Sequence, residues 1–297
     1  MAQVIPEWVE TIRRNKASKN RLGTAVHIDA AARKRGLACA IEGRSISLSR
    51  PVQSAPHAPA FAKSSYELTN SMRREGRLVV ARDHLCVDNH GMVNTHIDGL
   101  NHFGMDETWH DGSAAVLDES VPSIADWADT GLVTRAVFLD IPAIRGTPFV
   151  EADSPVGAKD MEAAVSVAGV ALERGDALIL YMGRDAYEPA HGLYDVVQKP
   201  AEVRPGIGKD GARWLSEQDV SMVLWDFMEA CGEEEMPYTV HLLIWAMGLI
   251  LIDNCHLGHL RAEFKNRAVK AGLLTVAPLK LAQATGCLVN PLLVLLA

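Results

Sequence analysis

Two histidines and an aspartate lie within seven residues of one another, in the stretch Asn94-Thr95-His96-Ile97-Asp98-Gly99-Leu100-Asn101-His102-Phe103. If residues 93–98 form a strand, His96 and Asp98 project from the same face, because side chains alternate with a period of two. Gly99 then allows the chain to turn so that His102 comes back beside them. Imidazole and carboxylate groups together suit zinc or manganese, and a third group beside them is placed for proton transfer. The motif predicts a metal site with its own acid–base residue.

A second pair of polar residues, His241 and Asp253, bounds a stretch of mostly apolar residues. A histidine beside such a stretch is most often a core residue with its hydrogen bonds satisfied, and a carboxylate there is costly to bury without a partner. The alternative is a helix that crosses the core and brings its two polar ends to one cluster of ligands. Chemistry alone leaves these two interpretations about equal.

The composition describes a globular protein with a sizeable core, since 48% of the 297 residues are hydrophobic and 22% are charged. The net charge of −8, without a basic run, argues against a nucleic-acid partner and against binding to an anionic membrane. Residues 1–20 lack the apolar core of a secretory signal, and the apolar run 242–252 is too short to span a bilayer. Five scattered cysteines do not suggest a disulfide framework. We therefore expect a cytoplasmic protein.

The elements that must position these residues can be placed from hydrophobic periodicity. The patterns predict helices at residues 7–20, 27–41, 159–174 and 211–218. They predict strands at 46–48, 78–80, 93–98, 133–141, 177–181, 220–225, 273–281 and 292–296, and a loop at 51–62. Helices and strands are mixed without the regular βαβ alternation of a doubly wound sheet, and no linker divides the chain. A GxGxxG or Walker pattern is absent, so a nucleotide cofactor is not indicated.

Several motifs resemble those of the metal-dependent cyclase family, which includes bacterial kynurenine formamidases and isatin hydrolases. Residues 95–103 are similar to the family's T-H-x-D-(A/G)-x-x-H-F core, and residues 175–180 to its G-D-(A/V)-L-L-(I/L) strand. His241 with the acidic Asp253-Asn254 resembles H-x11-E-N. Further similar segments are Pro205-Gly206-Ile207, Ala212-Arg213-Trp214-Leu215, Pro278-Leu279-Lys280-Leu281, Thr285-Gly286 and Asn290-Pro291, with Ala284 in place of a glycine. Together they run from about residue 94 to 291, roughly two-thirds of the chain.

The resemblance implies a fold and a set of site residues. The fold is a single α/β domain over residues 22–297, with a mixed, barrel-like sheet and flanking helices of the swivelling β/β/α class, preceded by a helical extension at 1–21. One or two ions of Zn²⁺ or Mn²⁺ are expected as cofactor, with His102 as the catalytic base and acid. The expected metal ligands are His96, Asp98, His241 and Asp253, and Tyr181 and Arg184 are expected to contact substrate. Independently of the resemblance, His90 is added as a further ligand because it is the nearest spare histidine, and Trp109 is added as a substrate contact because it lies just past the motif. A homodimer or homotetramer is the expected assembly.

The sequence departs from the family pattern at two ligand positions. Met92 stands where members with two metals have a histidine, and a thioether is a poor ligand for zinc or manganese. His90 is the nearest substitute, but six extended residues span roughly 20 Å, so it reaches the site only if the chain turns back at Gly91. Asp253 replaces a glutamate and reaches one methylene less far. A site with one metal, or with a weaker second metal, is therefore an alternative.

Three functions fit these features. The first is a metal-dependent hydrolase that opens a carbon–nitrogen bond of a small amide or lactam, with His102 as base to a metal-activated water. The second is a metal-dependent cyclase or dehydratase, or a lactone hydrolase, in which the same groups act on a ketone or lactone. The third is a non-catalytic small-molecule binder that lost its metal. We favour an enzyme, because the whole T-H-x-D-x-x-x-H core is present.

Overall fold

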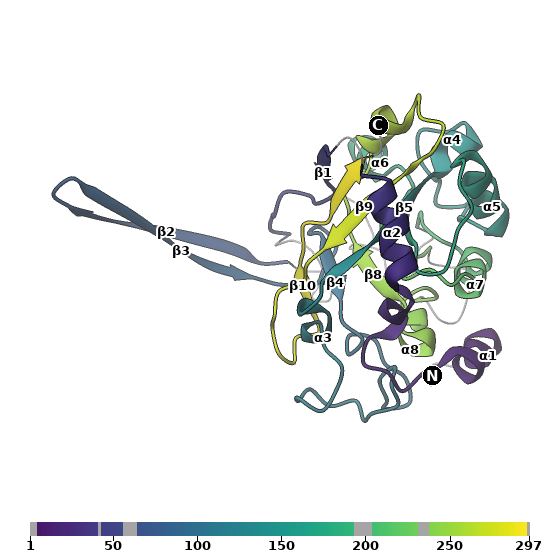
Figure 1. Cartoon of the computed structure of the whole chain (residues 1–297), viewed down its shortest axis with the longest axis horizontal. Coiled ribbons are helices and arrows are strands. Elements are labelled where there is room, and N and C mark those ends of the chain that lie inside the picture. Colours follow the sequence, from purple (N-terminus) through teal and green to yellow (C-terminus); the bar gives the residue numbers. More distant parts are fainter. Residues whose placement is uncertain (1–4, 41–42, 56–63, 193–203, 231–237, 296–297) are drawn as a thin grey trace.

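A mixed sheet that curls into a half-barrel, with helices along its outside, forms the body of the molecule (Figure 1). The computed structural model describes residues 5–40, 43–55, 64–192, 204–230 and 238–295. The sheet has the order β1-β11-β9-β5-β6-β7-β8-β4-β10. Its strands are β1 (Ser45–Ser47), β4 (His96–Asp98), β5 (Leu132–Asp140), β6 (Ala177–Tyr181), β7 (Met222–Trp225), β8 (Ile250–Asp253), β9 (Ala271–Val276), β10 (Gly286–Leu288) and β11 (Leu292–Leu295). The predicted fold class is confirmed.

The centre of the sheet is parallel. Strands β5, β6, β7 and β8 lie side by side, with Leu139 opposite Leu180 and Ile179 opposite Leu224. A parallel sheet is covered on both faces, so its strands are almost wholly apolar, which is why the sequence located three of these four strands. Helical segments connect the four strands in turn, so this part of the fold has the βαβ alternation that the sequence analysis did not recognise.

The segment between His241 and Asp253 is helical over only part of its length, although its two polar ends do meet in one cluster. A short helix, α8 (Leu242–Met247), ends at Gly248, whose φ of 70° is the left-handed conformation common at a helix C-terminus. The chain then enters strand β8, which pairs antiparallel to β4 with His96 opposite Asp253. The run Leu249-Ile250-Leu251-Ile252 after the glycine suits a buried strand, because β-branched side chains pack well there. Asp253 therefore reaches the site through strand pairing.

Three of the four predicted helices are shorter than expected, whereas the helix predicted at 211–218 begins two residues earlier and ends one residue earlier. Their bounds are α1 (Glu7–Lys16), α2 (Ala30–Ala38), α3 (Ala125–Ala128), α4 (Ile141–Arg145), α5 (Ala158–Val167), α6 (Arg184–His191), α7 (Lys209–Glu217) and α9 (Leu260–Phe264), with a 3₁₀ turn at Gly23–His27. Helix α2 begins after Asp29, whose side chain accepts a hydrogen bond from the backbone of Ala32. Strand β9 ends before Pro278, which cannot donate a backbone hydrogen bond to a neighbouring strand. Residues 56–62 of the predicted loop lie outside the described residues.

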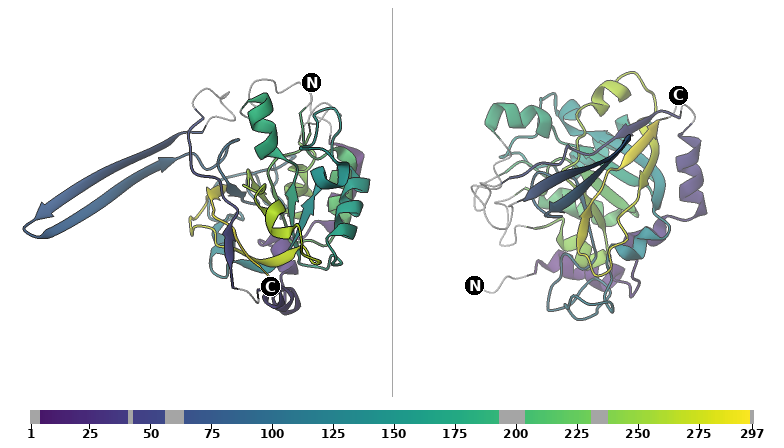
Figure 2. Two further views of the ribbon diagram at one scale, coloured as in Figure 1. Left: turned by 90° about the horizontal axis from the view of Figure 1, so that it is seen from above. Right: turned by 90° about the vertical axis from the view of Figure 1, so that its left-hand side faces the viewer.

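A long two-stranded hairpin projects from the body (Figures 1 and 2). It consists of β2 (Tyr66–Glu75) and β3 (Leu78–Val87), paired antiparallel from Tyr66–Val87 to Glu75–Leu78. Only the segment 78–80 of this hairpin was predicted from the sequence. Strand β10 was also missed, although it pairs with the motif strand β4.

The main core is a cluster of side chains between the sheet and its helices, with Trp127, Trp225, Phe138 and Phe264 among its buried members. Helix α1 packs on α8 through Val9 and Trp245. The predicted boundary near residue 21 stays a prediction. None of the helices in the described part of the chain is both long enough and apolar enough to cross a bilayer. The four cysteines that the structure describes are all free.

Candidate metal centre

The histidines and aspartates of the two sequence motifs converge on the carboxylate of Asp98. The nearest oxygen of Asp98 lies 3.1 Å from His90 Nδ1, 3.5 Å from His96 Nε2, 3.8 Å from His102 Nε2 and 3.6 Å from His241 Nε2. The second carboxylate, that of Asp253, joins them at one side. Its Oδ2 lies 3.5 Å from His241 Nε2 and 4.0 Å from His96 Nε2. The structure thus brings together all five predicted metal ligands and the predicted base.

His90 reaches the centre although it lies outside the T-H-x-D motif. The chain turns at Gly91, whose φ of 123° is a conformation that favours glycine. The imidazole of His90 stacks on that of His102, with ring centres 3.8 Å apart, and its Nε2 lies 3.0 Å from Thr285 Oγ1. Met92 is buried beside them, so the position of a histidine in the family pattern is held by a thioether. His90 thus brings an imidazole nitrogen to the centre, 3.1 Å from the carboxylate of Asp98.

The atoms at the middle of the cluster lack hydrogen-bond partners among the described residues. Both carboxylate oxygens of Asp98 and the Nδ1 atom of His90 are buried and unpaired. The 3.1 Å contact between them does not have hydrogen-bond geometry. Burying a carboxylate without a partner is costly, and a divalent cation among imidazole and carboxylate groups removes that cost. The donor set therefore fits a metal ion.

Two groups of three ligands share Asp98, and in each group the ligand atoms lie within 4.8 Å of one another. One group is His90, Asp98 and His102, and the other is His96, Asp98 and Asp253. This arrangement has room for one ion or for two around a common carboxylate. Zinc and manganese both accept nitrogen and oxygen ligands of these types.

Hydrogen bonds from a surrounding set of residues orient the ligands. The backbone oxygen of Asn94 lies 2.9 Å from His96 Nδ1, which leaves Nε2 of that ring facing the carboxylates. The indole of Trp225 donates to Asp253 Oδ1. On the far side of His241, the fully buried Glu229 lies 2.8 Å from Nδ1. A carboxylate behind a metal-binding histidine fixes its tautomer and raises its basicity.

The electrostatics of the cluster favour positive charge between its carboxylates. Burial alone would raise the pKa of Asp98, but the neighbouring imidazoles, first that of His102, outweigh it and hold that pKa well below its usual range. Burial alone would lower the pKa of His241, but the charge of Glu229 and the two aspartates raise it well above its usual value. Burial lowers the pKa of His102 to about 4. At neutral pH His102 is therefore a neutral imidazole that can accept a proton.

A pocket of about 210 Å³ opens onto the cluster. Besides the metal-binding candidates, it is lined by Phe103, Tyr238, Met228 and Arg204. Phe103 and Tyr238 pack edge to face, with ring centres 5.4 Å apart. The Nε atom of Arg204 donates to the backbone oxygen of Glu229 at 2.8 Å. The pocket therefore combines apolar walls with one cationic side chain, an arrangement that suits a small, partly polar organic molecule.

The three predicted substrate contacts are not among the described residues that line this pocket. Tyr181 is buried in the core and donates its hydroxyl hydrogen to Asp185 at 2.7 Å. Trp109 donates its indole hydrogen to the backbone of Val116 in a surface loop. Arg184 is buried and donates to the backbone oxygen of Met92 and to Asn254, both at 2.6 Å. Arg184 thus supports the chain that carries the ligands and does not face the pocket.

The residues that sequence reasoning missed lie in segments without a recognised motif. Glu229 follows strand β7 by four residues, and Tyr238 precedes His241 by three. Phe103 was noted only as the end of the motif. An acidic residue close after a buried strand was a usable signal, but Asp226 follows β7 directly and would have been chosen first. Asp226 instead accepts hydrogen bonds from the backbone of Met182, Gly183 and Arg184.

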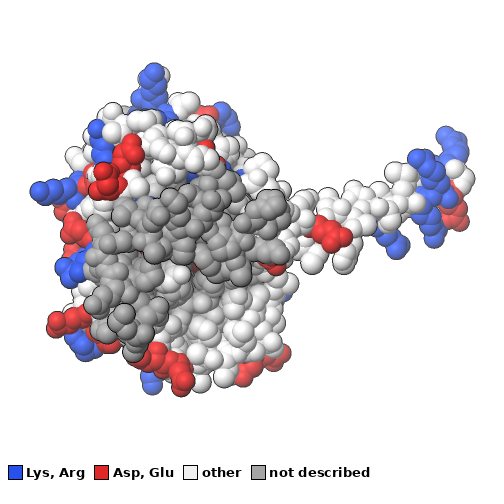
Figure 3. Space-filling view, turned by 180° about the vertical axis from the view of Figure 1, so that it is seen from behind, with Lys and Arg blue, Asp and Glu red and all other residues white. Residues whose placement is uncertain are grey.

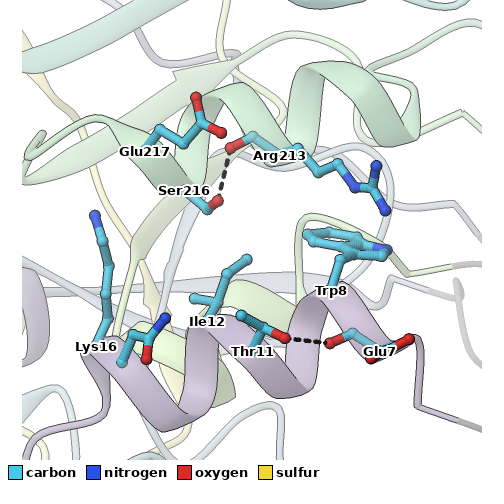
Figure 4. A pocket seen from close by; sticks show the side chains of 9 residues that line it. Glu7, Trp8, Thr11, Ile12, Lys16, Arg213, Ser216 and Glu217 are labelled. Atoms are coloured by element: carbon cyan, nitrogen blue, oxygen red, sulfur yellow. Dashed lines mark hydrogen bonds between the residues drawn. The ribbon is translucent and has the colours of Figure 1, made fainter.

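A larger groove of about 730 Å³ lies elsewhere, between helices α1 and α7 (Figure 4). Its hydroxyl groups bond to their own helices, Thr11 to the oxygen of Glu7 and Ser216 to that of Arg213. The described residues that line it include neither histidine nor cysteine. This groove is therefore larger but is not the candidate active site, because the imidazole and carboxylate groups that could bind a metal converge on the smaller pocket.

Comparison with known proteins identifies the family. The family model "Putative cyclase" matches residues 46–230, more than half of the chain, and the chain belongs to this cyclase family. The match includes the T-H-x-D motif and confirms the family predicted from the sequence. A search of curated proteins found no significant match.

Solved structures share the fold. A structure described as a novel cyclase is 21% identical, with a TM-score of 0.76, over 93% of this chain and 94% of that chain. Isatin hydrolase A from Ralstonia solanacearum is 14% identical, with a TM-score of 0.59, over 87% and 94%. Isatin hydrolase A from Labrenzia aggregata, bound to benzyl benzoate, is 17% identical, with a TM-score of 0.57, over 85% and 94%. At these identities the likeness establishes the architecture.

Proposed function

We propose that this chain is a metal-dependent hydrolase that opens a carbon–nitrogen bond in a small amide or lactam. The observation that carries the proposal is the buried carboxylate of Asp98, which lies at the meeting point of four imidazoles and accepts no hydrogen bond from the described residues. The similarity in fold to isatin hydrolases supports the choice of reaction class. The pocket supports the choice of a small substrate, since 210 Å³ is the share of roughly seven water molecules in the liquid.

In this proposal His96, Asp98, His241, Asp253 and His90 hold Zn²⁺ or Mn²⁺. When bound, such an ion acts as a Lewis acid, which lowers the pKa of a water molecule from 15.7 toward about 7 and polarises a carbonyl group. Glu229 holds His241 with Nδ1 protonated, so that Nε2 is free to face the ion.

His102 transfers the proton. Its Nε2 atom faces Asp98 at 3.8 Å, and its ring is held against His90. Neutral His102 accepts a proton at Nε2 from the attacking water and delivers it to the nitrogen that leaves when the carbon–nitrogen bond breaks. Phe103 and Tyr238 provide an apolar wall for the ring of the substrate and reduce the access of bulk water. Arg204 supplies a cation for a polar substituent or for the new carboxylate.

Two other functions use the same site. A cyclase, dehydratase or lactone hydrolase would need the same ion and base, whereas a non-catalytic binder would need neither. The replacement of the family's histidine by Met92 favours the binder, but His90 restores a nitrogen ligand at the centre. We therefore retain the hydrolase as the proposed function.

The test is product analysis with the metal-loaded protein. Protein loaded with Mn²⁺ or Zn²⁺ is incubated with aryl formamides, isatin-like lactams and lactones in ¹⁸O-labelled water. A hydrolase of carbon–nitrogen bonds places the label in a new carboxylate from the amide or lactam, and His102→Gln removes that product. Turnover of lactones alone, or a product without label, would contradict the proposed reaction.

A further inference from the structure

Arg13 joins helix α1 to the body of the molecule. Its Nη1 atom donates hydrogen bonds to the backbone oxygens of His110 and Trp245, the latter at 2.6 Å, and its Nη2 atom donates to that of Trp109 at 3.4 Å. The guanidinium group also lies over the ring of Trp245, 4.7 Å from its centre. The arginines at the far end of the hairpin instead project into the solvent, as Figure 3 shows. Arg13 is therefore used for contacts within the molecule.

The two segments that Arg13 joins each lead to a side chain of the candidate site. Trp245 lies about one turn after His241 on helix α8, which packs beside α1 (Figure 1). The other segment, residues 104–110, directly follows Phe103, which forms part of the wall of the metal-site pocket. Arg13 thus closes a joint behind the pocket, between the chain that carries a proposed metal ligand and the chain that carries an apolar wall.

Residues 104–110 run as a loop, so their shape depends on contacts with other segments. Asp106 and Glu107 have φ values of 49° and 55°, in the left-handed region that is costly for residues other than glycine. Such a conformation persists where the surrounding structure holds it. The indole of Trp245 supplies one of the contacts that hold the loop, since it donates to Thr108 Oγ1 at 3.1 Å. The guanidinium group that bonds to the end of the loop supplies another.

An apolar cluster connects helix α1 to the pocket. Val9 of α1 is fully buried against side chains of α8. Phe103 packs against the same cluster, and the centre of its ring lies 5.6 Å from that of His241. A ten-residue helix is marginally stable by itself in water, so α1 keeps its place through this packing and through its bonds to the body. Helix α1 therefore supports the apolar wall of the pocket from behind.

We propose that Arg13 is a positioning residue, which fastens helix α1 across the segments behind Phe103 and His241 and thereby sets the wall of the pocket. Helix α1 is not among the described segments that line the pocket, so its effect there passes through these two segments. The fastening stands on the contacts of Arg13 alone, whereas its effect on binding rests on the proposed metal site. If Arg13 only anchored the helix, its loss would free α1 and leave the pocket unchanged.

The first test is hydrogen exchange of the metal-free full chain, measured by mass spectrometry. Arg13→Met keeps an unbranched side chain and removes the donors, and the control Arg14→Met changes the exposed neighbour, which bonds to Thr11 of its own helix. We expect exchange in residues 103–110 and 242–247 to become about tenfold faster or more in Arg13→Met alone. Loss of a hydrogen bond to a charged group corresponds to at least that factor in an opening equilibrium. Unchanged exchange in either segment would overturn the proposal.

The second test measures whether the pocket changes with the helix. Acetohydroxamate and benzohydroxamate bind a metal through the same group, but only benzohydroxamate carries a ring that needs the apolar wall. Titration of the Zn²⁺-loaded protein with both probes gives the ratio of their affinities. We expect Arg13→Met to reduce the preference for benzohydroxamate about 2–12-fold, the factor that corresponds to one aromatic pair, and Arg14→Met to leave it unchanged. Lower stability with an unchanged ratio would reduce Arg13 to an anchor of the helix and overturn the proposal.

Arg13→Lys keeps the proposal testable if Arg13→Met does not fold. Its single ammonium group keeps the charge but cannot span the three backbone oxygens that the guanidinium group reaches. Exchange in the same two segments should again be faster than in the wild type, and unchanged exchange would overturn the proposal. A wild type that binds neither Zn²⁺ nor the probes would contradict the metal site, and the exchange measurement, made without metal, would still decide the role of Arg13.

Discussion

Substitution of Glu229 tests whether the cluster around Asp98 is arranged to bind a metal. Glu229 is fully buried, and its two oxygens lie 2.8 Å and 3.1 Å from His241 Nδ1. The opposite nitrogen of the same ring faces Asp98 and Asp253 at 3.6 Å and 3.5 Å. If an ion lies between these carboxylates, the charge of Glu229 acts on it through the imidazole. Glu229→Gln removes that charge and keeps an oxygen that accepts from Nδ1.

The expected magnitude follows from what each variant removes. A hydrogen bond to a charged group contributes about 1.5–3 kcal/mol, and a hydrogen bond between neutral groups contributes about 0.5–1.5 kcal/mol. Glu229→Gln replaces the first kind by the second, so the support of His241 should weaken by about 1–1.5 kcal/mol. That difference corresponds to roughly a tenfold weaker affinity for the metal. Glu229→Ala also removes the acceptor, and its loss should approach the upper end of the 10–100-fold range typical of residues that support metal-binding histidines.

The assay is competition with a chromophoric chelator for Zn²⁺ and Mn²⁺. Glu173→Gln is the control, because Glu173 pairs with Arg135 and is not among the described residues that line the metal-site pocket. We expect the order wild type and Glu173→Gln, then Glu229→Gln, then Glu229→Ala. If both Glu229 variants bind metal within twofold of the wild type, His241 is not a ligand supported by Glu229, and the reasoning fails.

Three further predictions concern catalysis, packing and pH. His102→Gln should keep its metal and lose about 10²–10⁴-fold in turnover, and loss of the metal would make His102 a ligand instead of the base. Phe138→Ala should reduce the free energy of unfolding by about 3–5 kcal/mol in urea titrations, because it leaves a cavity beside Phe264; a loss below about 1 kcal/mol would contradict the packing. Burial alone would raise the pKa of Glu188, but hydrogen bonds from Arg50 outweigh it and lower the pKa. The contribution of this carboxylate to stability is therefore fully present at a pH above its pKa in the unfolded chain, and it is lost as the pH falls through its lower pKa in the folded protein. Unfolding titrations of Glu188→Gln from neutral to acidic pH should therefore show a smaller loss than the wild type, and parallel curves would refute this.

The sequence was most informative where one physical rule decides the structure. Strands β5 and β6 were located because strands buried on both faces must be apolar along their length. His96 and Asp98 were placed on one face because the period of a strand is two, and the structure places both side chains at the centre. The need for a turn at Gly91 was deduced from distance alone, and the chain does turn there.

The sequence was least informative where contacts between distant segments decide the structure. An apolar run of this length suits a helix or a strand, and Gly248 alone marked the change from one to the other. Glu229 and His241 meet through the tertiary fold, so no spacing predicted their pairing. Strand β2 is rich in polar residues, and its alternation becomes evident only beside the register of β3. Tyr181 and Arg184 were placed in the pocket by resemblance, whereas the fold turns both into the interior.

The most direct test of the account is the metal content of the purified protein, measured by elemental analysis for wild type and Asp98→Asn. Asparagine keeps the size of the side chain and removes the charge shared by both ligand groups. We expect at least one equivalent of zinc or manganese per chain in the wild type and little in the variant. A folded wild-type protein that takes up neither metal after loading would contradict the claim that these residues form a metal centre.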